Sequence, residues 1–161
     1  MSKEEILKNC TWDSYDMATL DVNIPILSTN VKIDFLPPLK SGRTLTDDMV
    51  LALNSVIKLD VSQLDIIKSY LFWHFNLCCE ATYYGFDIDF AEGESNSDAN
   101  KRYFDIKNED DAWKKSKLEC LIIDEHEGTT VTFQFEVPWE DEHGCEIEFI
   151  NGKIVNYENN N

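Results

Sequence analysis

Residues 117–137, KLECLIIDEHEGTTVTFQFEV, decide the fold of this chain. Two runs rich in apolar residues flank a polar centre with Glu127-Gly128, which is the pattern of two strands joined by a turn. In the second run, apolar residues alternate with polar ones. The apolar set is Val131, Phe133, Phe135 and Val137, and the polar set is Thr132, Gln134 and Glu136. This alternation predicts a sheet with one buried and one solvent-facing side, so helices should cover the buried side.

Residues 145–158, CEIEFINGKIVNYE, extend the same sheet. Their Asn151-Gly152 dipeptide between alternating apolar residues is the strongest short hairpin signal. The two stretches together predict four strands in an antiparallel meander at the C-terminal end.

The first half of the chain adds a strand pair and two helices. Residues 19–36 alternate β-branched and polar residues about a central Ser-Thr-Asn, which predicts two strands and a turn. A helix over 46–59 should begin with Thr46 as its cap, because two acids follow in its first turn. A longer helix is predicted over 62–83.

The longer helix carries two apolar stripes. One stripe should face the core, and it consists of Leu64, Ile67, Leu71, Phe75 and Cys78. The other consists of Ile66, Tyr70, Trp73 and Leu77. His74 falls beside the first stripe, so we expect a partly buried imidazole with one hydrogen bond rather than a metal ligand.

Residues 86–111 have a different character. FDIDF, at 86–90, predicts a short strand, and AEGESNSDANKR, at 91–102, predicts an exposed, mobile loop. Asn108 should then cap a short helix that is anchored by Trp113. The whole chain, residues 1–161, is therefore predicted to be a single α+β domain, with a C-terminal antiparallel β-meander and helices packed on one face.

The composition indicates an acidic protein outside the membrane. The 161 residues carry a formal net charge of −17, yet 43% are hydrophobic, which is typical of a globular chain. The apolar stretches are too short for a membrane helix, and the N-terminus lacks the apolar region of a secretion signal. The chain has five cysteines, which is an odd number, and Cys78 and Cys79 are adjacent, so they cannot readily bridge each other. Both features indicate reduced thiols. We therefore predict a cytoplasmic protein.

Two acid-histidine clusters, at 124–126 and 141–143, raise the question of a metal or catalytic site. In a meander they would be two successive turns, separated by a strand of about nine residues, or roughly 30 Å, so that one metal ion could not hold both. No catalytic motif accompanies either cluster. We therefore predict no enzyme, no catalytic residue, no cofactor and no metal. A metal-binding or hydrolytic domain that uses one of the two turns is the alternative.

Charge is segregated in the last third of the chain. Between Leu118 and Gly152 there are ten acidic residues and no lysine or arginine. Such a surface can serve solubility alone, or it can attract a basic partner. Nucleic acid is disfavoured as a partner, because binding it requires many cationic side chains. The candidate partner-binding residues are Glu125, Glu127, Glu140, Asp141, Glu142, Glu146 and Glu148.

The second cluster is embedded in a motif that predicts a structural corner. Pro138 should end the preceding strand, after which Trp139 can fold back onto the sheet as an anchor. Glu142 and His143 are expected to hydrogen-bond across the connection, while Gly144 takes a positive φ to restart the next strand.

These residues also carry a family resemblance. The segment 131–158, VTFQFEVPWEDEHGCEIEFINGKIVNYE, resembles bacterial small domains of unknown biochemical function that end in a strand, a Trp-x-x-Glu-His-Gly block and an Asn-Gly or Asp-Gly hairpin. Trp139, Glu142, His143 and Gly144 occupy the block. Such domains are similar to immunity proteins of polymorphic or contact-dependent toxin systems.

The resemblance and the charge together imply an acidic cytoplasmic interaction protein. The leading hypothesis is an immunity protein that binds a cognate bacterial toxin domain and occludes its basic cleft. Nuclease toxins are one candidate class, because they must grip phosphates. A domain of a phage or mobile element that mimics nucleic-acid charge is a further alternative.

Overall fold

The computed structural model describes residues 1–161 except 39–40, 83, 85–87, 151–152 and 155–161. For residues 153–154 it describes the backbone but not the side chains. The helices are α1 (Lys3–Asn9), α2 (Asp47–Ile57), α3 (Val61–Ala81), α4 (Asn96–Phe104) and α5 (Glu109–Lys115), with a short 3-10 helix, η1 (Pro25–Leu27). The strands are β1 (Thr11–Trp12), β2 (Ala18–Ile24), β3 (Thr29–Leu36), β4 (Lys117–Asp124), β5 (Thr130–Val137), β6 (Glu140–Ile150) and β7 (Lys153–Ile154). The α+β class predicted from the sequence is confirmed.

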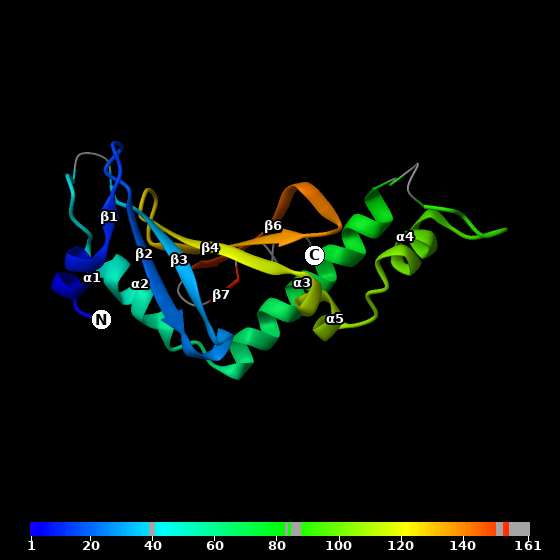
Figure 1. The fold of residues 1–161 in the computed structure, drawn as a ribbon, viewed down its shortest axis with the longest axis horizontal. Coiled ribbons are helices and arrows are strands. Elements are labelled where there is room, and N and C mark those ends of the chain that lie inside the picture. The colour runs from blue at the N-terminus through cyan, green and yellow to red at the C-terminus, as the bar shows by residue number, and fades with distance from the viewer. Residues whose placement is uncertain (39–40, 83, 85–87, 151–152, 155–161) are drawn as a thin grey trace. The chain divides into compact units, whose positions relative to one another are not determined.

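The strands form one seven-stranded sheet in chain order, β1 to β7. The pairs β1–β2, β2–β3 and β6–β7 are antiparallel, whereas β3 and β4 are parallel, with Lys32 opposite Cys120. Parallel neighbours need a long crossover, and residues 37–116 supply it, with α2 to α5 in the part of this stretch that the structure describes (Figure 1). Local patterns predicted the N-terminal strand pair and the C-terminal strands, but they did not predict that the two groups share a sheet. The predicted hairpin tip at 151–152 lies outside the described residues.

The chain divides into two compact units. The first comprises residues 1–64, 118–134 and 146–161, and the second comprises 65–117 and 135–145. The prediction of a single domain stays a prediction.

In the first unit, α2 covers one face of the sheet. Thr46 caps α2 by accepting a hydrogen bond from the Met49 amide, as predicted. Met49, Leu53 and Val56 are buried at spacings of four and three, and α2 lies against β2 (Figure 1). The turn between β2 and β3 begins earlier than predicted, because Pro25 starts η1 and Ser28 adopts a left-handed conformation.

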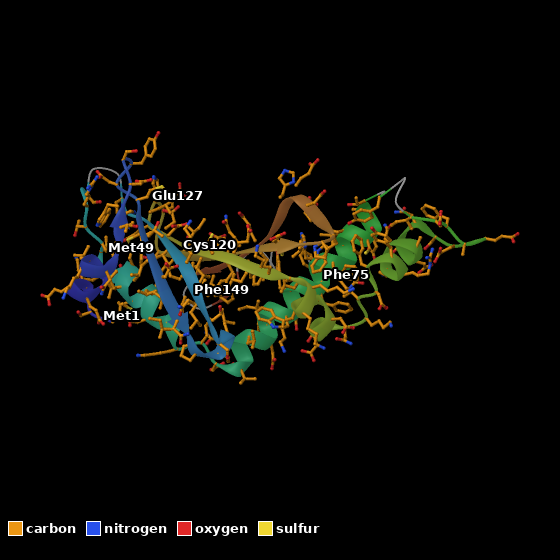
Figure 2. The ribbon with its side chains drawn as sticks, viewed as in Figure 1. Met1, Met49, Phe75, Cys120, Glu127 and Phe149 are labelled. Atoms are coloured by element: carbon orange, nitrogen blue, oxygen red, sulfur yellow. The ribbon has the colours of Figure 1, made fainter. Side chains whose placement is uncertain are left out.

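In the second unit, α3 buries the predicted core stripe from Ile67 onward, whereas Leu64, in the first unit, is only half-buried. Ile67, Leu71, Phe75 and Cys78 are buried, and Figure 2 labels Phe75 on this helix. The other stripe is only partly covered, since Ile66 and Leu77 are 49% and 45% exposed.

The first turn of α5 is tied to α3 by side-chain contacts. The Lys68 ammonium lies 2.7 Å from the Asp110 carboxylate, and the Ser69 hydroxyl donates to Glu109 over 2.7 Å. The predicted cap also forms, because the Asn108 side chain accepts from the Asp111 amide.

The predicted loop over 91–102 is wrong for most of its length, because α4 occupies 96–104. Ser95 caps α4 through a hydrogen bond from the Asp98 amide, and Ala99 and Phe104 become buried. Tertiary contacts therefore stabilise a segment whose polar composition has no helical period. The predicted strand over 86–90 lies partly outside the described residues, and the structure assigns no strand to 88–90.

Candidate functional site

Trp139 is the central side chain of the predicted corner. Pro138 and Trp139 form the turn between β5 and β6, and Trp139 is only 1% exposed. Its ring packs edge-on against Phe75, with 5.4 Å between the ring centroids. The Tyr84 hydroxyl donates a hydrogen bond of 2.6 Å to the Trp139 carbonyl oxygen. The buried Trp139 side chain therefore anchors the β5–β6 turn to the core of the second unit.

His74 completes this buried cluster. The Trp139 indole N–H donates to His74 Nδ1 over 3.0 Å, which places the proton of the neutral imidazole on Nε2. Burial lowers the pKa of His74, and the nearby Glu140 carboxylate raises it by a smaller amount. The expectation of a partly buried histidine with a hydrogen bond is confirmed, although the sequence did not indicate Trp139 as its partner.

A Cys-His pair beside this cluster lacks the properties of a nucleophile. The Cys78 sulfur lies 3.8 Å from His74 Nε2 and 3.9 Å from Nδ1. Burial raises the pKa of the Cys78 thiol to about 11, with a smaller contribution from Glu140. A thiol in this state remains protonated at neutral pH, so the geometry supports packing rather than covalent catalysis.

Gly144 occupies a position that only glycine fits. Its φ is +68°, and a Cβ added there would collide with the backbone carbonyl oxygen of Phe135. The residue lies within β6, because the two-residue turn at 138–139 already reverses the chain. The prediction that 141–143 form a turn is therefore wrong, since these residues are part of a strand.

Glu142 and His143 lie on the surface at the start of β6. The His143 side chain is 82% exposed, and its Nδ1 lies 3.6 Å from a carboxylate oxygen of Glu140. Its neighbour in space is therefore Glu140, whereas the sequence pattern favoured Glu142. Asp141 and Glu142 are both exposed, so the second unit gathers Glu140, Asp141 and Glu142 on one short segment.

The other four candidate residues belong to the first unit, where they have different surroundings. Glu125 accepts a hydrogen bond from the Thr46 hydroxyl and so supports the start of α2. Glu127 is exposed in the β4–β5 connection and is labelled in Figure 2. Glu146 accepts from the Gln134 amide over 2.9 Å, and Glu148 is half-buried on the same strand.

The first unit also has a polar network on the solvent-facing side of the sheet. The Cys120 thiol donates to Gln134 over 3.1 Å, and Gln134 in turn reaches Glu146. On neighbouring strands the Thr19 hydroxyl donates to Asp34 over 2.7 Å, and Lys32 pairs with Asp34 at 2.7 Å. Alternation predicted this polar side, but the partners depend on the strand register.

The two acid-histidine clusters fall in different units. Among the residues with described positions, no three His, Cys, Asp or Glu side chains are grouped so that they could hold a metal ion. In the first cluster the structure places only His126 and Asp124 together, with 3.2 Å between Nδ1 and the carboxylate oxygen.

The chain belongs to a family described as a domain of unknown function (DUF6985), whose sequence profile matches residues 4–160. No curated protein and no solved structure matches the chain. Within the described part of the chain, none of the helices has the length and apolar character needed to cross a membrane.

Proposed function

We propose that this protein is an acidic interaction protein that binds a basic protein partner, and that the partner is a cognate bacterial toxin domain. The observation that carries the proposal is the charge of residues 118–152, where acids outnumber lysine and arginine by ten to none. Complementary fields accelerate encounter and discriminate against wrong partners. The protein would neutralise the toxin by occluding a cationic cleft.

The exposed start of β6 is the part of this surface that we assign to the partner. Asp141, Glu142 and His143 are exposed and project from a strand whose origin is held by the buried Trp139. A rigid support lowers the entropy lost when a surface binds. Buried Trp139 and tightly packed Gly144 thus act as support, while the exposed carboxylates would make the contacts.

The proposal places the protein in the cytoplasm. All five cysteines are free thiols, and Cys78, Cys79 and Cys145 are buried. Free thiols are the usual state in a reducing compartment. An immunity protein there would protect the producing cell before its toxin is exported.

A charge-reversal pair tests the proposal. The partner to use is the C-terminal domain encoded by the reading frame next to this one, measured by calorimetry against the wild type, Glu142→Lys and Glu80→Lys. Both variants change the net charge equally, and both positions are exposed in the second unit. We expect Glu142→Lys to weaken binding by about tenfold or more, because a rim charge is reversed, and Glu80→Lys by about twofold at most.

The dependence on salt supplies a second readout. Affinity for the partner should fall steeply as salt increases from about 50 to 500 mM, since the Debye length shrinks over this range. Equal losses for the two variants, or an affinity that salt leaves unchanged, would contradict the proposal.

A further inference from the structure

A groove in the first unit lies between α2 and the sheet. It has a volume of about 680 Å³. The wall formed by α2 consists of Asp48, Leu51, Ala52, Ser55 and Val56. Their spacing of three, four, seven and eight residues places them on one face of the helix, so the groove follows α2 for about 12 Å.

The floor of the groove is apolar and comes from the sheet. Phe133 on β5 and Phe149 on β6 line it, with 5.1 Å between their ring centroids. Figure 2 labels Phe149 and, in the connection that forms one end of the groove, Glu127. The rings are almost fully buried, so the floor has a defined shape before anything binds.

The rim exposes large apolar side chains to solvent. Leu51 is 66% exposed and Ile150 is 38% exposed, and both line the groove. Single exposed apolar residues are common on surfaces, but two that border one groove with an apolar floor favour a binding surface there.

The charge of the rim selects the partner. Asp48 and Glu127 are the charged side chains among the described residues of the lining, and both are acidic. An occupant that reaches these carboxylates would gain from lysine or arginine beside its apolar face. The groove is long enough for about two turns of helix, which is the dimension at which an amphipathic helix is recognised.

We propose that the groove between α2 and the sheet binds a basic amphipathic helix of a protein partner. The apolar face of that helix would lie between Leu51, Phe149 and Ile150, and its cationic residues would meet Asp48 and Glu127. This inference deepens the proposed function, and it rests on that function because the partner is taken to be positively charged. It adds a binding site in the first unit to the acidic start of β6 in the second.

The test uses a defined probe. A fluorescent helical peptide of leucine and lysine, roughly 14 residues long to give four turns, is titrated by anisotropy against three proteins. These are the wild type, Leu51→Arg and the matched control Leu77→Arg, which replaces an exposed leucine of α3. Both variants add one positive charge at an exposed helical position, and arginine is a good helix former, so both should fold.

We expect a saturable complex with the wild type, a loss of about tenfold or more in affinity for Leu51→Arg, and a change of about twofold at most for Leu77→Arg. A peptide with glutamate in place of lysine should not bind. Equal losses for the two variants, or no saturable complex, overturn the groove as the site. If sedimentation shows a dimer that Leu51→Arg dissociates, the occupant is a second copy of this chain, and the proposal is overturned as well.

The outcome separates the two proposals. If Leu51→Arg leaves the peptide affinity unchanged, the groove fails, while binding of a basic partner at the start of β6 is still decided by Glu142→Lys. If Glu142→Lys has no effect on the toxin partner, the acidic surface fails, while the groove is still decided by the peptide.

Discussion

At the residue scale, Gly144 is constrained by both its conformation and its surroundings. At a φ of +68°, an amino acid with a side chain is strained. The space that its Cβ would occupy is also filled by the Phe135 carbonyl oxygen. Neither condition can be relieved by a small side-chain rotation, because the neighbouring atom belongs to the backbone.

Gly144→Ala should therefore lower the free energy of unfolding by about 3 kcal/mol, since it combines backbone strain with a collision. Gly93→Ala is the control, because Gly93 has a similar φ of +78° with nothing within 4 Å of the added atom. It should cost about 1 kcal/mol. Denaturant unfolding measures both, and equal losses would show that the contact with Phe135 does not matter.

His74 makes stability depend on pH. Its folded-state pKa lies below the ordinary value of 6.5 because burial disfavours the imidazolium, whose Nδ1 could no longer accept from Trp139. On acidification below 6.5 the unfolded chain binds a proton that the folded chain resists, so the contribution of His74 is complete above 6.5 and is lost as the pH falls.

The free energy of unfolding should therefore drop more between pH 7.5 and 5.5 in the wild type than in His74→Gln, whose amide oxygen can still accept from Trp139. His126→Gln, which removes an exposed imidazole of the first unit, is the control variant. Parallel slopes for the wild type and His74→Gln would contradict the assignment.

At the element scale, α4 is held to the end of α3 by asparagine side chains. Asn100 is fully buried, and its amide donates to the carbonyl oxygens of Cys79 and Thr82, each over 2.9 Å. Asn96 donates to the same Thr82 oxygen. These bonds satisfy carbonyl groups that the end of a helix leaves without partners.

Asn100→Asp should destabilise the protein by about 3 kcal/mol or more, because a buried acceptor replaces the donor that faces two carbonyl oxygens. The control is Asn76→Asp, at a less buried position on α3 where the amide donates to the Phe72 carbonyl, and it should cost about 1 kcal/mol. Hydrogen exchange should show faster opening of the last turn of α3 in Asn100→Asp. Equal costs would show that capping by α4 is unimportant.

The segment before α4 is tied down by an ion pair between Arg102 and Glu94. Arg102 donates to both carboxylate oxygens of Glu94, each over 2.8 Å, and also reaches the Asp89 carbonyl. The hydrogen bonds from Arg102 lower the pKa of Glu94 to about 2, with help from the Ala91 amide. This bidentate pair explains how a segment with the composition of a loop keeps a definite path.

At the scale of the whole molecule, the net charge of −17 acts on stability as well as on partners. Like charges repel one another more strongly in the compact state than in the unfolded chain. Raising salt from about 20 to 300 mM should therefore increase the melting temperature by about 2–5 °C. Calorimetric scans measure this, and a melting temperature that stays constant or falls would show that self-repulsion is negligible.

Local patterns predicted most elements of the fold. Alternation identified β2 to β6, capping residues located the starts of α2 and α5, and the apolar spacing of α3 identified its buried stripe. The failures occur where long-range contacts decide the structure. Helix α4 depends on burial of Ala99 and Phe104. Residues 141–143 are part of a strand because the turn lies at 138–139, where Trp139 packs against the distant Phe75.

The candidate site shows the same division. The acidic residues and the motif that contains Trp139 and Gly144 can be recognised in the sequence, because charge and a glycine or proline at a turn are local features. The bond between Trp139 and His74 joins residues 65 positions apart, and the groove combines α2 with β5 and β6. Neither could be predicted without the packing.

The sequence by itself determined the α+β class, the position of most helices and strands, and the concentration of negative charge, because periodicity, capping and composition act over a few residues. Only the tertiary structure decided that β3 pairs with β4 in parallel, that Trp139 is buried against His74, and that an acid-rimmed groove with an apolar floor opens beside α2. These features depend on which elements, distant in the sequence, bury their apolar surfaces against each other, and no local pattern specifies which elements pack together.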